Sequence, residues 1–294
     1  MKTIAIFLPG LLLLAIIGCS SARYLEMTRM GETAFQEKDY QKALETSEEI
    51  ISDPPKKQYP EPGRIYALAG NSAFALEQYK KSQDYLERAR QLNYSNELVC
   101  LNLASIYQRI GNLSKEITIL ETYNQKYSSG TEINYVREKL YQTYWESMNY
   151  DLAVSLWPLL DDPARSDLYN LELFLEVNRS LKNDSICDLL AEVIMEQNPE
   201  NEPALSWIAK KYYWQAENRY QAEMTAYDKN KTHSQYAILL EAFKTVTLDF
   251  KESLGYFTRL YELYPNPDYA KYLGNIYVRL NAKQKARYYR SLGQ

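Results

Sequence analysis

Residues 271–290 read KYLGNIYVRLNAKQKARYYR, and this segment defines the helical unit from which the fold is built. Two short helical patterns flank a turn at residues 281–283. Gly274 lies seven residues before the start of this turn, and Ala286 lies five residues after it. Small residues at these two positions allow two helix backbones to approach closely where the helices cross. The segment therefore predicts a helix–turn–helix unit.

The same arrangement recurs along the chain. Turns that begin at residues 38, 77 and 111 are each preceded, at an interval of seven, by a small residue. Extending this frame gives eight markers, which are Gly31, Gly70, Ala104, Tyr141, Leu175, Lys211, Glu241 and Gly274. Successive markers are 30–39 residues apart. A sustained period of this length indicates a repeat protein, in which each unit packs on its neighbours.

The repeated unit resembles the tetratricopeptide repeat (TPR), a helix–turn–helix of 34 residues. That family has small residues at positions 8 and 20, an aromatic residue at position 11 and often proline at position 32. In this frame the markers take position 8, Tyr107 and Tyr277 take position 11, and Pro199 and Pro265 take position 32. The resemblance implies an all-α fold, an α-solenoid superhelix of tetratricopeptide-like repeats.

The match to the repeat is uneven within the predicted array, residues 24–294. It is good over residues 24–130 and 234–294 and weaker over residues 134–233. In the weaker part the residues at position 8 are large, namely Tyr141, Leu175 and Lys211.

Several single residues carry local predictions. Pro158 falls inside a second helix, which it should kink or end early because proline cannot continue a helix. Residues 203–230 contain no glycine or proline after Pro203, so the sequence leaves open one long helix or a helix pair. His233, the only histidine, lies beside a capping box formed by Thr232 and Gln235.

The N-terminal residues have the pattern of an export signal. Lys2 precedes an apolar run over residues 4–17, which is shorter than the roughly 20 residues of a permanent membrane span. The run ends in Ile16-Ile17-Gly18-Cys19, which resembles the lipobox of bacterial lipoproteins. The resemblance implies transfer of diacylglycerol to Cys19, cleavage after Gly18 and acylation of the new terminus. The alternative is an ordinary signal peptide with a chance cysteine.

The lipobox resemblance also implies a location. Residues 1–18 would be the cleaved signal peptide, and residues 19–23 a lipid-anchored leash that spans roughly 14 Å when extended. Ser20 follows the cysteine, which by resemblance to lipoprotein sorting in enteric bacteria implies the outer membrane of the cell envelope. No acidic run follows Cys19, which favours the leaflet facing the periplasm.

Composition excludes several classes of function. The 294 residues include 34 Lys and Arg against 38 Asp and Glu, a net charge of −4. Nucleic-acid binding requires clustered positive charge, so a nucleic-acid partner is not predicted. One histidine, three cysteines and no glycine-rich phosphate loop give no catalytic constellation and no metal or cofactor site. Cys100 and Cys187 lie two repeats apart and are predicted to be buried and unpaired. The sequence therefore predicts a protein that is not an enzyme.

The candidate binding surface is the concave face that first helices form in such arrays. The resemblance places positions 2, 5, 6, 9, 12 and 13 of repeats two to four on this face. These positions hold Arg64, Asn71, Phe74, Asn102, Arg109, Tyr135, Lys139, Gln142 and Trp145. Aromatic side chains mixed with amide and cationic groups are typical of protein-binding surfaces, so a protein or peptide partner is predicted.

Two narrower hypotheses concern this face. Phe74 and Trp145 occupy position 12, where an aromatic residue gains little from core packing, so both are predicted to be partly exposed and dispensable for folding. Asn71, Asn102 and Lys139 resemble three of the five residues of the carboxylate clamp of chaperone-tail-binding repeats. The alternative is that these asparagines are structural. At the level of the whole protein, the alternative function is a glycan-binding lipoprotein of the outer membrane.

Overall fold

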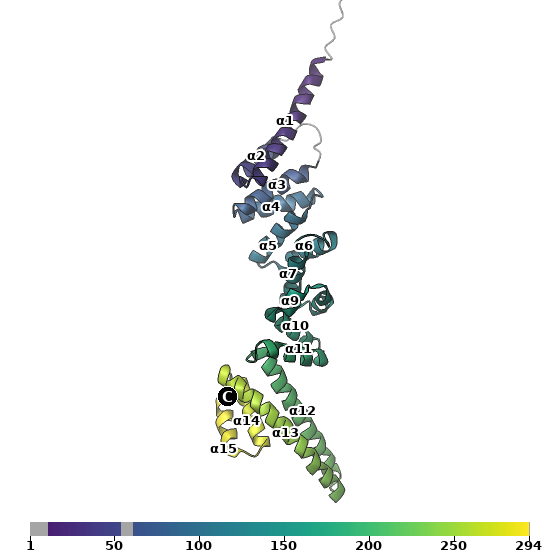
Figure 1. Cartoon of the computed structure of the whole chain (residues 1–294), viewed down its shortest axis with the longest axis vertical. Helices are drawn as coiled ribbons and strands as arrows, with labels where there is room; N and C mark the ends of the chain where they lie inside the picture. Colours follow the sequence, from purple (N-terminus) through teal and green to yellow (C-terminus); the bar gives the residue numbers. More distant parts are fainter. Residues whose placement is uncertain (1–10, 54–60, 294) are drawn as a thin grey trace, which may run out of the picture. The chain divides into compact units, whose positions relative to one another are not determined.

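The computed structural model describes residues 11–53 and 61–293, with side chains described from residue 22 onward. The secondary structure of these residues is helical and contains no strand. The chain divides into two compact units, residues 1–147 (unit 1) and residues 148–294 (unit 2). The predicted all-α solenoid is confirmed by the succession of helix pairs within each unit (Figure 1).

Unit 1 consists of consecutive helices in which each helix packs on its neighbours in the sequence. The helices are α1 (Leu11–Gln36), α2 (Tyr40–Ser52), α3 (Pro62–Ala75), α4 (Tyr79–Gln91), α5 (Glu97–Arg109), α6 (Leu113–Lys126) and α7 (Ile133–Glu146). Asn96 and Asn112 cap α5 and α6, because their side-chain oxygens accept hydrogen bonds from backbone N–H groups of the first turn.

Helix α1 differs from the prediction for the N-terminal residues. The backbone is helical from Leu11 through the predicted leash at residues 19–23, because no glycine or proline follows Gly18 to end the helix before the first repeat. In helical form those residues span about 6 Å rather than the roughly 14 Å of an extended chain. Residues 1–10 of the predicted signal peptide and the side chain of Cys19 lie outside the described part. Among the described residues, no helix is both long and apolar enough to cross a membrane.

Unit 2 begins with short helical pieces and ends with longer ones. The elements are α8 (Tyr150–Leu156), the 3-10 helix η1 (Trp157–Leu159), α9 (Asp162–Ser166), α10 (Leu168–Ser180), α11 (Asp184–Gln197), α12 (Glu202–Lys229), α13 (His233–Leu263), α14 (Pro267–Arg279) and α15 (Lys283–Leu292). The predicted effect of Pro158 is confirmed, since α8 ends two residues before it and the chain continues as a 3-10 turn. Cys100 of unit 1 and Cys187 of unit 2 are buried and free, as predicted.

The turn inside most repeats contains one residue in the left-handed region, seven positions after the marker. These residues are Lys38 (φ 64°), Glu77 (59°), Gly111 (66°), Met148 (59°), Lys182 (61°) and Asn281 (56°). Only Gly111 is a glycine, so the other five adopt a conformation that costs non-glycine residues about 1 kcal/mol or more. The weakly matching markers Tyr141 and Leu175 are thus followed by the same turn as Gly70 and Gly274.

The markers Lys211 and Glu241 are wrong. Both residues lie inside long helices, α12 and α13, which form a single hairpin joined at residues 230–232 (Figure 1). Residues 203–229 lie in α12, so this segment forms one long helix and not a helix pair. The repeat pattern predicted for residues 234–294 does not hold before α14, because α13 continues without a turn to Leu263. The physical reason is that residues 212–229 and 242–254 contain no glycine or proline, so neither helix ends after its marker.

The long hairpin has a crossing of its own. Ser253 of α13 donates a hydrogen bond to the backbone oxygen of Ala209 in α12 at 2.9 Å. An equivalent bond joins Ser82 to the oxygen of Gly70 at 2.8 Å across α3 and α4. Ala209 and Ser253 thus take the places of positions 8 and 20, separated by 44 residues instead of 12. The hairpin is a repeat whose two helices are lengthened. Thr232 caps its second helix by accepting a bond from the Gln235 N–H at 3.2 Å, as the capping box predicted.

Glycines at two helix crossings lie very close to atoms of the facing helix. A Cβ atom at Gly70 would lie 2.5 Å from Cδ2 and 3.1 Å from the backbone nitrogen of Leu86. A Cβ atom at Gly274 would lie 2.7 Å from Cγ and 3.1 Å from the backbone nitrogen of Arg290. Both distances to side-chain carbons are shorter than van der Waals contact. The two glycines are therefore required by close helix approach, as the sequence predicted.

Tyrosines join successive repeats of unit 1 through hydrogen bonds to glutamates. The hydroxyl of Tyr107 in α5 donates to Glu87 in α4 at 2.7 Å, and the hydroxyl of Tyr144 in α7 donates to Glu121 in α6 at 2.7 Å. Both tyrosines occupy position 11 of their repeats, where the family has an aromatic residue. Burial, together with the bond to the carboxylate, raises the pKa of each tyrosine. The position therefore contributes a polar contact between repeats as well as apolar area.

The Glu87 contact predicts how stability depends on pH. Burial alone would raise the pKa of Glu87, but hydrogen bonds from Gln83, Tyr107 and Lys115 outweigh it and lower the pKa to about 2 from its ordinary 4.5. The carboxylate therefore stabilises the fold fully above pH 4.5, and this contribution is lost as the pH falls toward 2. We expect Glu87→Gln to reduce the free energy of unfolding by about 1–2 kcal/mol at pH 6. The difference from wild type should vanish near pH 2 in urea titrations, and a constant difference would contradict the account.

Candidate partner-binding face

All nine residues of the predicted binding face lie on first helices of unit 1. Arg64, Asn71 and Phe74 are on α3, Asn102 and Arg109 on α5, and Tyr135, Lys139, Gln142 and Trp145 on α7. Their surroundings divide them into an asparagine pair, an aromatic–arginine cluster, an ion pair and the residues of α7.

The asparagine pair joins α3 to α5. The amide nitrogen of Asn102 donates a hydrogen bond to the side-chain oxygen of Asn71 at 2.9 Å, and both residues are buried. This bond leaves the Asn71 amide nitrogen and the Asn102 side-chain oxygen without a hydrogen-bond partner among the described residues. Both atoms keep some contact with solvent, because among the described residues only the Trp145 indole nitrogen is a fully buried side-chain N or O atom without a partner. The pair thus retains one donor and one acceptor for a ligand.

Phe74 has a packing role that the sequence analysis missed. Its ring packs edge-to-face on Tyr79, the first residue of α4, with ring centroids 5.6 Å apart. The same interval of five residues recurs in the preceding repeat, where Phe35 packs on Tyr40 at 5.3 Å. Such pairs contribute about 0.5–1.5 kcal/mol. Phe74 is partly exposed, as predicted. Its dispensability for folding stays a prediction, and the contact with Tyr79 sets the stability that truncation would remove.

Arg109 belongs to the same cluster. Its guanidinium carbon lies 4.3 Å from the centroid of the Tyr79 ring, on which it makes a cation–π contact. The side chain is otherwise exposed. Arg64, by contrast, is directed to the neighbouring repeat, where its Nε lies 2.7 Å from Oε1 of Glu32 in α1. Arg64 is therefore already paired and is the least available of the predicted cations.

Of the four predicted residues on helix α7, only Tyr135 is exposed. Tyr135 is 51% exposed. Lys139 is partly buried and donates a long hydrogen bond of 3.4 Å to Gln142. The indole nitrogen of Trp145 is buried and has no hydrogen-bond partner among the described residues. An unpaired buried donor costs about 1–3 kcal/mol.

A buried carboxyl group beside α7 was not predicted. Glu116 of α6 is 3% exposed, and the hydroxyl of Thr143 lies 3.2 Å from its carboxylate. Burial raises the pKa of Glu116, an effect that Thr143 and Lys139 partly offset. The sequence signal was present, since Glu116 stands at position 20 where a small residue is expected.

The carboxylate-clamp hypothesis gains no support from the geometry. Asn71 and Asn102 are bonded to each other, and Lys139 is bonded to Gln142. Within the described part of the chain, no hydrogen bond links Lys139 to the asparagine pair. Nor do the described residues contain a group of three or more His, Cys, Asp or Glu side chains that could hold a metal ion.

Comparison with known proteins shows similarity in structure but not in sequence. No family model matches the chain, and no curated protein matches it. A solved structure from Bacteroides ovatus, described as that of a protein-binding protein, has a TM-score of 0.51 and 17% identity, covering 75% of this chain and 98% of its own. The C-terminal part of a TPR repeat-containing protein from Cytophaga hutchinsonii has a TM-score of 0.48 and 14% identity, covering 90% of this chain and 93% of its own. A tetratricopeptide repeat protein from Parabacteroides merdae has a TM-score of 0.43 and 12% identity, covering 92% and 93%. All three structures come from bacteria and two are named as TPR-repeat proteins. The similarity to the Bacteroides ovatus structure shows the fold alone.

Proposed function

We propose that this chain is a lipid-anchored scaffold of the bacterial cell envelope that binds a protein or peptide partner and carries out no catalysis. The partner would lie along the first helices α3, α5 and α7 of unit 1. The anchor would be Cys19, acylated after cleavage at Gly18, and the lipid would hold the protein in the outer membrane facing the periplasm.

The binding proposal rests on unpaired polar groups of these helices. The Asn71 amide nitrogen is a donor, and the Asn102 side-chain oxygen is an acceptor. A peptide backbone offers both carbonyl and N–H groups, so it can satisfy both. Tyr135 adds an exposed aromatic surface of the kind found at the centre of interfaces. The protein-binding description of the structurally similar Bacteroides ovatus protein is consistent with this proposal.

The anchoring proposal is supported by the sequence Ile16-Ile17-Gly18-Cys19 at the end of an apolar run. Two or more acyl chains give stable membrane attachment, whereas a single chain gives only reversible binding. A scaffold fixed in this way would hold its partner near the membrane surface.

Affinity purification of the tagged full-length chain from detergent-solubilised envelopes tests the scaffold proposal. We expect one or a few proteins to copurify in near-stoichiometric amounts and to be identified by mass spectrometry. Recovery of the chain with polysaccharide, and with no protein above the level of an untagged control, would contradict the proposal and favour the glycan-binding alternative.

A further inference from the structure

A pocket lined by charged and polar residues lies apart from the predicted binding face. It has a volume of about 370 Å³ and is formed mainly by the second helices α4 and α6, together with α5. The side chains that line it are Glu87, Arg90, Gln91, Tyr107, Lys115 and Thr118. None of these residues belongs to the predicted binding face.

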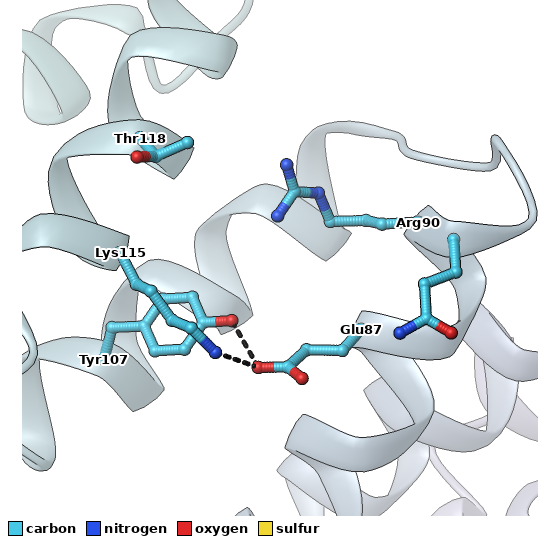
Figure 2. A pocket seen from close by; sticks show the side chains of 6 residues that line it. Glu87, Arg90, Tyr107, Lys115 and Thr118 are labelled. Atoms are coloured by element: carbon cyan, nitrogen blue, oxygen red, sulfur yellow. Dashed lines mark hydrogen bonds and ion pairs between the residues drawn. The ribbon is translucent and has the colours of Figure 1, made fainter.

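One wall of the pocket is held in place by a carboxylate oxygen of Glu87 that accepts three hydrogen bonds. Oε1 of Glu87 accepts hydrogen bonds from the Tyr107 hydroxyl at 2.7 Å and from the Lys115 ammonium at 2.9 Å, both drawn in Figure 2. Gln83 donates to the same oxygen at 3.0 Å. The Lys115 nitrogen also lies 5.2 Å from the centroid of the Tyr107 ring. This wall is therefore held in place before any ligand arrives.

Arg90 is the unpaired cation of the pocket. Its side chain is partly buried, and its guanidinium makes no hydrogen bond or ion pair with the described residues. Figure 2 shows the guanidinium directed into the space between Thr118 and the Glu87–Lys115 pair. Gln91 adds a second free donor, because its side-chain oxygen accepts a bond from Arg88 at 3.0 Å and its amide nitrogen has no partner among the described residues.

The charges that line the pocket sum to one positive charge. Arg90 and Lys115 are cationic, and Glu87 is anionic. A ligand with one negative charge would therefore neutralise the site, whereas a dianion would leave an excess charge. The planar guanidinium fork also matches a carboxylate, to which it donates two parallel hydrogen bonds. The Thr118 hydroxyl already donates to the backbone oxygen of Ser114 at 2.9 Å, so it is not available as a donor to a ligand.

We infer that this pocket binds a carboxylate group of a protein partner, with Arg90 as the main recognition residue. The carboxylate comes from an acidic side chain or from a chain terminus, because both present the same planar monoanion. The pocket thus forms a second docking site on unit 1, separate from the face on α3, α5 and α7.

Fluorescence anisotropy on the full-length protein in detergent tests the inference. One dye-labelled probe is a peptide of five glutamates with blocked ends, and a second is a peptide of five glutamines with a free C-terminal carboxylate. We expect at least one probe to bind, which identifies the source of the carboxylate. A blocked five-glutamine peptide should not bind.

Three variants make the test specific. Arg90→Gln should weaken the bound probe at least fivefold, whereas Glu87→Gln should tighten it, because the only acidic group in the pocket is removed and Lys115 is released. Lys80→Gln removes the same charge from an exposed position of α4, where Lys80 forms an ion pair with Asp84, and should change affinity less than twofold.

The inference would be overturned by three results. The first is the absence of binding by both carboxylate probes. The second is equal weakening by Arg90→Gln and Lys80→Gln, which would indicate unspecific charge attraction. The third is displacement of the probe by inorganic phosphate at a lower concentration than by acetate, which would make the pocket a phosphate site. Because Arg90 and Lys80 lie on α4, outside the predicted face, these results are independent of the test of the proposed function.

Discussion

Replacing Gly70 with leucine should unfold unit 1 more readily than any surface substitution in the same unit. The added Cβ alone would lie 2.5 Å from Cδ2 of Leu86, a fully buried side chain, and 3.1 Å from its backbone nitrogen. Rotation of the Leu86 side chain cannot relieve the contact with the backbone, so α3 and α4 must move apart. We expect Gly70→Leu to lower the free energy of unfolding by about 3 kcal/mol, measured by urea titration with circular dichroism.

Two control variants test whether the loss of stability in Gly70→Leu comes from the close approach of α3 and α4 or from substitution in general. Lys80→Leu places the same side chain at an exposed position of α4 and should cost less than about 0.5 kcal/mol. Gly255 lies within α13 with no atom within 4 Å of an added Cβ, so Gly255→Ala should stabilise unit 2 by about 0.5–1 kcal/mol. Equal stability of the Gly70→Leu and Lys80→Leu variants would contradict the assigned helix crossing.

The second large effect is expected at Cys19. Cys19→Ala removes the thiol to which the proposed diacylglycerol is attached, so the protein should lose its label from radioactive palmitate and move from the membrane pellet to the soluble fraction. Each buried methylene of an acyl chain contributes about 0.8 kcal/mol to membrane binding, so loss of the lipid should release nearly all of the protein.

Cys100→Ala is the matched control for this experiment. Cys100 is a buried free cysteine inside α5, and its removal should leave both labelling and fractionation unchanged. Retention of palmitate label and membrane attachment by Cys19→Ala would contradict the anchoring proposal.

The sequence predicted the helix crossings well because their requirement is steric and local. A Cβ atom at Gly70 or Gly274 would lie 2.5 or 2.7 Å from a side-chain carbon of the facing helix. The register failed at Lys211 and Glu241 because those two markers were inferred from spacing alone. A repeat with lengthened helices keeps its crossing, here Ala209 and Ser253, but moves it out of the expected interval.

The candidate face was only partly predictable. Its nine residues do lie on first helices, but which of them are already engaged depends on neighbouring helices. The Phe74–Tyr79 contact could have been recognised, because Phe35 and Tyr40 show the same interval of five residues. The Asn71–Asn102 bond depends on the side-chain conformations of two residues 31 positions apart, which the spacing does not determine.

The central claim is that a partner binds the first helices of unit 1, and two tyrosines allow a direct measurement. Tyr135 of α7 and Tyr169 of α10 stand at the same position of their repeats and are 51% and 52% exposed. Truncating either should leave folding intact. Retention of the copurifying protein should fall roughly fivefold for Tyr135→Ala, equivalent to about 1 kcal/mol, and stay unchanged for Tyr169→Ala. Unchanged retention in Tyr135→Ala, or an equal loss in both variants, would contradict the claim.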